Sequence, residues 1–148
     1  MIVTFCGHAD YQKKEEDERK LLALLEERIG DMPVQMYLGG YGSFDEFAYD
    51  CCRSYREKHP QTCLVWVTPY LDFSRRQAFD PPKYDDILYP EIEDKPLKFA
   101  IIYRNRYMVE KADLVVAYVS HAWGGAYASY QYARRKGKEI FNLAAFRE

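Results

Sequence analysis

Short apolar runs alternate with longer amphipathic stretches along this chain. Five runs bounded by Gly, Pro or polar residues predict strands at 2–6, 34–38, 63–67, 113–119 and 139–143. Nearly every position in these runs is apolar, which is typical of strands buried on both faces of a parallel sheet. Apolar residues at helical spacing predict helices over 12–29, 43–59, 98–111 and 125–136.

This alternation predicts an α/β fold: a doubly wound, Rossmann-like parallel sheet of about five strands with helices on both faces. Residues 1–148 are expected to form a single domain. The segment 71–96 contains several prolines, tyrosines and acids and has no regular period. A long irregular stretch in a compact domain is often a lid or a binding loop, and we expect that role here.

Two glycine pairs stand where a predicted strand meets a helix. The first lies in Gly39-Gly40-Tyr41-Gly42-Ser43, and the second in Trp123-Gly124-Gly125. The first N–H groups of a helix lack partners, and glycine lets a ligand approach the backbone. Ser43 is expected to cap its helix, with Glu46 in the capping-box position. A turn and a cap without any ligand is the alternative interpretation.

The carboxyl ends of parallel strands meet at one edge of the sheet, where ligands of such folds bind. Arg104 and Asn105, on the predicted helix 98–111, could bind phosphate and read a base or ribose edge. Aromatic Tyr41, Tyr70 or Trp123 could stack on a base. The residues expected to contact a ligand are Gly7, His8, Gly39, Gly40, Tyr41, Gly42, Ser43, Asp45, Thr68, Arg104, Asn105, Gly124 and Gly125.

Charge and composition narrow the expected partners. The formal net charge is −2, which gives no basic footprint and argues against nucleic acid as a partner. The basic run 134–136 is interpreted as a helix C-terminal cap. No apolar run approaches ~20 residues and no signal peptide is visible, so we expect a cytoplasmic protein without a membrane partner. The four cysteines lack metal-ligand spacing, and we expect neither metal nor cofactor.

The motifs resemble the SLOG superfamily in order along nearly the whole chain. They are Val3 to His8, Gly39 to Asp45, Arg104 to Val109 followed by Ala112-Asp113, and Gly124-Gly125. That Rossmann-like group joins the DNA-processing protein Smf/DprA to the LOG phosphoribohydrolases, and the resemblance is greatest to small YpsA-like members. It implies a site for nucleotides or nucleotide-derived signals, and the LOG motif would assign catalysis to Arg104 and a glutamate. No glutamate follows Gly125 at that spacing, whereas Glu46 follows the first pair.

We therefore predict that the chain binds a nucleotide or nucleotide-like small molecule, in sensing or signalling. The first alternative is a nucleoside-monophosphate N-glycosidase using Glu46 and Arg104 as catalytic residues. The second is a structural or partner-binding module whose tyrosines form an interface. A homo-oligomer is expected from the resemblance.

Overall fold

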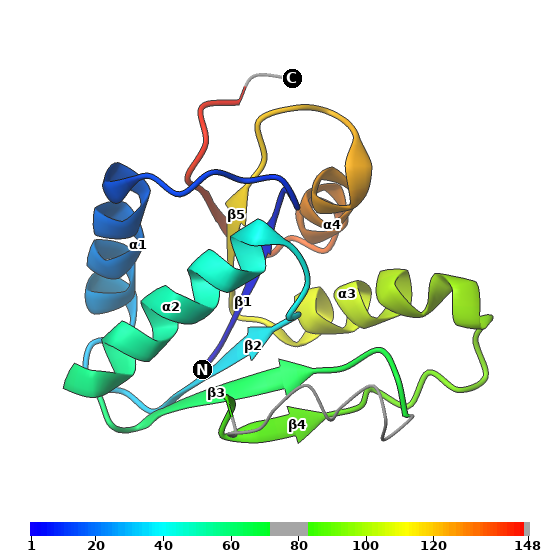
Figure 1. The fold of residues 1–148 in the computed structure, drawn as a ribbon, viewed down its shortest axis with the longest axis horizontal. Coiled ribbons are helices and arrows are strands. Elements are labelled where there is room, and N and C mark those ends of the chain that lie inside the picture. The colour runs from blue at the N-terminus through cyan, green and yellow to red at the C-terminus, as the bar shows by residue number, and fades with distance from the viewer. Residues whose placement is uncertain (72–82, 147–148) are drawn as a thin grey trace.

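In a computed structural model, the chain forms a six-stranded parallel sheet flanked by helices (Figure 1). The structure describes residues 1–71 and 83–146. The sheet has the order β4-β3-β2-β1-β5-β6, and every neighbouring pair is parallel. The strands are β1 (Ile2–Gly7), β2 (Val34–Leu38), β3 (Thr62–Val67), β4 (Asp86–Leu88), β5 (Leu114–Tyr118) and β6 (Glu139–Asn142). The predicted doubly wound α/β class is confirmed.

Two helices cover each face of the sheet (Figure 1). The helices α1 (Glu15–Arg28) and α2 (Ser43–Lys58) pack their apolar stripes on residues such as Val3, Phe5 and Met36. The helices α3 (Ala100–Lys111) and α4 (Gly124–Arg135) cover the other face through Met108, Val109 and Ala133, among others. Burial of both sheet faces explains why the strand runs are almost entirely apolar.

The structure has one strand that we did not predict, β4, and it lies inside the segment that we expected to be irregular. It pairs with β3 at the edge of the sheet, with Val65 opposite Asp86 and Val67 opposite Leu88. The backbone N–H of Leu64 also donates to Asp85 Oδ2 at 2.8 Å. A segment of three residues, one of them acidic, is too short to show the alternation of a strand. Its pairing with the neighbouring strand is what makes it a strand. Residues 72–82 of the predicted loop lie outside the described part of the chain.

The capping residue of α2 and the start of α3 differ from the predictions. Gly42, with φ +86°, precedes α2 as its N-cap, and Ser43 is the first helical residue. The Ser43 hydroxyl donates instead to the carbonyl oxygen of Tyr11, so the predicted serine cap is wrong. Before α3, residues Leu97–Phe99 form a 3₁₀ turn, η2. Within the described residues, no helix is long and apolar enough to cross a membrane.

Candidate functional site

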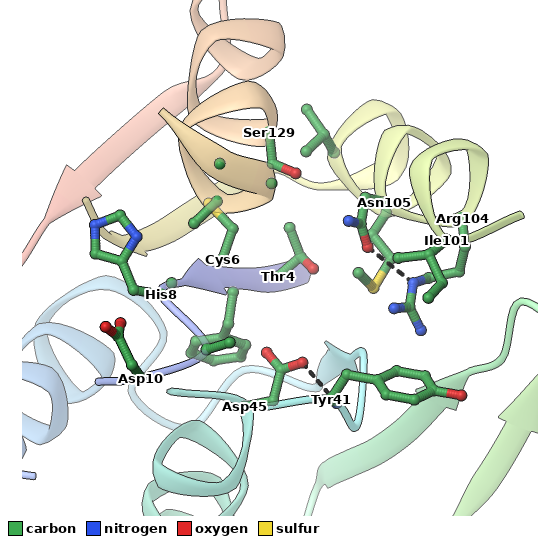
Figure 2. Close-up of a pocket in the computed structure, with 18 of the residues that line it drawn as sticks. Thr4, Cys6, His8, Asp10, Tyr41, Asp45, Ile101, Arg104, Asn105 and Ser129 are labelled. Atoms are coloured by element: carbon green, nitrogen blue, oxygen red, sulfur yellow. Dashed lines mark hydrogen bonds between the residues drawn. The ribbon is translucent and has the colours of Figure 1, made fainter. Parts of the chain in front are cut away.

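A cavity of about 400 Å³ opens at the carboxyl end of β1, between α3 and α4 (Figure 2). The chain proceeds outward from β1 to β2 on one side, while β5 flanks β1 on the other, so the cavity lies at the topological switch point. Parallel α/β sheets bind ligands there. Its walls combine Thr4 and Cys6 from β1, Ile101 and Met108 from α3, and Ser129 from α4.

Eight of the residues expected to contact a ligand line this cavity. They are Gly7, His8, Tyr41, Asp45, Arg104, Asn105, Gly124 and Gly125. Gly39, Gly40, Gly42, Ser43 and Thr68 do not line it, and neither does Glu46, which is exposed on α2. Thr68 is fully buried, and its hydroxyl forms a local turn with Tyr70.

The first glycine turn is filled by the protein itself. A Cβ at Gly40 would lie 2.8 Å from Trp66 Nε1, and one at Gly42 would lie 2.9 Å from Ala9 Cα. The turn's amide groups also have internal partners. The N–H of Tyr41 donates to Asp45 Oδ2 at 2.8 Å, and that of Ser43 donates to Ala9 O at 2.9 Å. These glycines therefore permit close packing, and we find no open phosphate cradle in the turn.

The second glycine turn is open. Apart from the chain neighbours and the backbone of α4, no atom of the described residues lies within 4 Å of a Cβ built at Gly124 or Gly125, and both residues are exposed. The helix α4 begins at Gly124 after Trp123, and no side chain among the described residues caps it. The first N–H groups of α4 face the mouth of the cavity with a positive helix dipole, an arrangement that favours an anion.

Three rings form a stack at that mouth. The His121 ring lies 3.7 Å from the His8 ring at 11° and 3.7 Å from the Trp123 ring at 20°, centroid to centroid. His8 is buried, whereas Trp123 is 68% exposed. The stack therefore runs from the buried end of β1 to a solvent-facing indole. A nucleic-acid base is an aromatic ring that stacks well on such a surface.

The backbone holds His8 in one tautomer. The N–H of Ser120 donates to His8 Nε2 at 2.9 Å, so the Nε2 atom is an unprotonated acceptor. Burial lowers the pKa of His8 below 6.5, and the neighbouring His121 lowers it further. The charge of Asp10 acts in the opposite direction on this pKa. With Nε2 as an acceptor, the buried His8 ring packs against His121 at the inner end of the stack.

Arg104 joins the ends of β2 and β3 through hydrogen bonds to backbone carbonyl oxygens. Its Nη1 donates to Gly39 O at 2.8 Å and to Val67 O at 2.7 Å, and its Nε donates to Asn105 Oδ1 at 2.9 Å. The side chain is only 2% exposed. Most of its donor capacity therefore serves the protein, although its guanidinium still borders the cavity.

Asp45 faces the cavity from the start of α2 (Figure 2). Burial raises the pKa of its carboxyl to about 6, although the Tyr41 N–H and the Arg104 charge act in the opposite direction. The carboxylate accepts the hydrogen bond of the Tyr41 N–H, so this amide is already paired with an anionic group of the protein. An anionic ligand is therefore favoured at the α4 side of the cavity rather than at the α2 side.

Basic residues gather on the part of the chain that forms the α3 and α4 face. Residues 95–138 contain nine Lys and Arg but only two acids, whereas the rest of the chain has 12 and 21. The nine are Lys95, Lys98, Arg104, Arg106, Lys111, Arg134, Arg135, Lys136 and Lys138. The net charge of −2 hides this separation because it averages over the strongly acidic remainder. Counting by segment shows that the cations are concentrated in this part of the sequence, and all of them but the buried Arg104 are candidates for a surface that attracts phosphate.

The comparisons with known proteins support the fold. The chain is similar to DNA processing protein A from Helicobacter pylori, whose structure was reported for its single-stranded DNA binding mode. The two share 17% sequence identity at a TM-score of 0.64, and the match covers 96% of this chain and 64% of that one. No protein-family model and no curated protein matches this chain. The likeness agrees with the Smf/DprA side of the SLOG resemblance at the level of fold.

This finding overturns two predictions. We predicted a nucleotide-like small molecule as ligand, with N-glycosidase and partner-binding alternatives, and we argued against nucleic acid as a partner. The similar structure is one of a protein that binds single-stranded DNA. The physical reason for the error is that net charge was used in place of charge distribution.

The sequence reasoning also missed part of the cavity wall. Trp123 was considered individually, but its stack on His121 and His8 joins residues more than a hundred positions apart. Ser129 and Asp10 line the cavity and lie outside the motifs, and Thr4 lies in the first motif but was not among the residues expected to contact a ligand. The helical spacing of Gly125 and Ser129, one turn apart on α4, was the one signal that could have found Ser129.

Proposed function

We propose that this chain binds single-stranded nucleic acid at the carboxyl edge of its sheet, with a base stacked on Trp123. The observation that carries the proposal is the His8–His121–Trp123 stack, which ends in a 68% exposed indole beside the open N-terminus of α4. Base stacking on an aromatic ring and phosphate binding at helix amides are the two interactions that an unpaired strand offers.

The similar structure and the basic segment support the same proposal. DNA processing protein A shares this fold, and residues 95–138 supply the cations that a phosphate backbone needs. Stacking tolerates any base, since every base has a π-face, so we expect weak sequence preference. The chain spans 64% of the length of that structure, and the activity of the whole DNA-processing protein is not assigned to it.

The test is a titration with a fluorescein-labelled oligothymidylate of about 12 nucleotides, within the ~4–16 that one binding domain covers. We expect Trp123→Ala to weaken binding by about 5- to 150-fold, because stacking contributes ~1–3 kcal/mol per base, and Trp123→Phe to retain most of the affinity. Met32→Ala is the matched control, since Met32 is also exposed and apolar but precedes β2 at the opposite edge. Absence of saturable binding, or equal affinity for Trp123→Ala, would refute the proposal.

Within the SLOG superfamily, we also propose a place among the small YpsA-like members, because the described residues fold as one Rossmann-like unit. A single domain over residues 1–148, a cytoplasmic location and self-association remain predictions.

A further inference from the structure

A groove continues from the cavity along the seam between α3 and α4. Its volume is about 120 Å³, and it shares Asn105, Gly125 and Ser129 with the cavity wall. Beyond these shared residues it is lined by Ile102, Arg106, Ala128, Gln131, Tyr132 and Arg135. The cavity and the groove therefore adjoin at the seam, with Asn105, Gly125 and Ser129 bordering both.

Three cations surround one aromatic ring in this groove. The guanidinium carbons of Arg106 and Arg135 lie 5.5 and 5.8 Å from the Tyr132 ring centroid, and Lys136 Nζ lies 5.4 Å from it. Arg106 comes from α3, whereas Arg135 and Lys136 come from the end of α4. The Tyr132 ring therefore contacts one arginine from each helix at the seam.

In the described part of the chain, the cations of this cluster form no direct ion pair, although Glu110 lies close by on α3. Among residues 1–71 and 83–146, no carboxylate lies within 4.0 Å of a charged nitrogen of Arg106, Arg135 or Lys136. The neighbouring carboxylate of Glu110 accepts a hydrogen bond from the hydroxyl of Tyr132. Like charges held together in this way favour an anion between them, and a planar guanidinium matches the two free oxygens of a phosphodiester.

We propose that the α3–α4 groove is a second subsite, which binds the phosphate backbone of a single strand whose base is stacked on Trp123. This inference rests on the proposed function and adds the course of the strand: from the cavity mouth, past Gly125 and Ser129, to Arg106 and Arg135. It also assigns a role to Arg106 and Arg135 that differs from that of Arg104, whose guanidinium is bonded to backbone carbonyls.

The test is the salt dependence of binding to the oligothymidylate of about 12 nucleotides. Each phosphate contact on a single strand adds about 0.7 to the slope of log affinity against log salt. The double variant Arg106→Gln with Arg135→Gln should therefore lower the slope by about 1.4. Its affinity should be about 25-fold weaker at ~0.1 M salt and nearly equal to the original at ~1 M.

Two further variants separate charge from structure. Arg106→Lys with Arg135→Lys keeps both charges, and it should retain most of the slope even where the bidentate geometry is lost. Arg19→Gln with Lys20→Gln removes two charges from exposed positions on α1, on the opposite face, and should leave the slope unchanged. Circular dichroism melting of each variant checks that the fold is intact.

The outcomes distinguish this inference from the proposed function. An unchanged slope for the glutamine double variant, with binding still weakened by Trp123→Ala, would overturn the groove but leave the proposed function standing. An equal decrease of the slope in the α1 variant would also overturn the proposal of a groove subsite, because the effect would then be one of overall charge. Absence of binding by the unmodified chain would overturn both.

Discussion

The two glycine turns at the carboxyl edge of the sheet share a Gly-Gly pair and a following helix, but their surroundings are opposite. Around Gly40 and Gly42, the side chain of Trp66 and the backbone of Ala9 occupy the space that a ligand would need. At Gly124 and Gly125, no other segment of the described residues comes within 4 Å of the Cβ positions. The same residue type therefore serves close packing in one turn and exposure of the backbone in the other.

This difference shows what a glycine motif can and cannot indicate. Glycine is favoured where the backbone adopts a positive φ or another atom approaches closely, and that atom can belong to the protein or to a ligand. The distinction depends on contacts between distant segments. Ala9, for example, precedes Gly42 by 33 positions, and no local pattern announces their contact.

Substitution of Gly42 should produce the largest effect on stability. Gly42 has φ +86°, and a Cβ there would lie 2.9 Å from Ala9 Cα. We expect Gly42→Ala to lower the free energy of unfolding by about 3–4 kcal/mol, from strain and crowding together. Chemical denaturation measures this change.

Gly137→Ala provides the matched control for that experiment. Gly137 also has a positive φ, +68°, but nothing lies within 4 Å of its Cβ position. It should lose only about 1 kcal/mol, the cost of the backbone conformation alone. Equal losses at the two positions would show that the first turn is not crowded.

Local pattern predicted most of the fold. The strand at 34–38 matches β2 at both ends, and α2 begins at Ser43 as expected, because apolar periodicity and the flanking Gly and Pro mark these limits. The strand β4 was missed because its pairing with β3 decides it. The edge of the sheet that holds the site followed from topology, since parallel strands direct their carboxyl ends to one side.

The interior of the site could not be predicted in the same way. The hydrogen bonds from Arg104 to the carbonyl oxygens of Gly39 and Val67 join residues that are 65 and 37 positions apart. The basic character of residues 95–138 was available in the sequence, but it appears only when charge is counted by segment. Segment charge should therefore be examined before nucleic acid is excluded as a partner.

Asp45 offers a second way to examine the filled turn, because its carboxylate accepts the Tyr41 N–H. Its pKa in the folded state is raised from 3.8 to about 6, mainly by burial. A raised acid pKa means that the folded state holds the proton more tightly than the unfolded state. This group therefore lowers stability progressively as pH rises from about 4 to about 6.

We expect the free energy of unfolding of the original chain, relative to that of Asp45→Asn, to fall by about 2 kcal/mol across this window. Denaturation of both proteins at a series of pH values measures the difference, and their comparison cancels the titration of other groups, including His8. A flat difference would show that Asp45 is well solvated, and that the first turn is more open than its contacts indicate.

The smallest expected effect comes from the open turn and has the opposite sign. Gly125 lies in the first turn of α4 without a positive φ, and a methyl group there meets no atom within 4 Å. Gly125→Ala should raise the free energy of unfolding by about 0.5–1 kcal/mol, since alanine restricts the unfolded chain and favours the helix. Oligothymidylate binding should weaken in the same variant, because the methyl group projects where the strand passes from the cavity to the groove. Gain of stability with loss of binding would identify this glycine as one retained for a ligand, whereas loss of stability would place it with the packed glycines of the first turn.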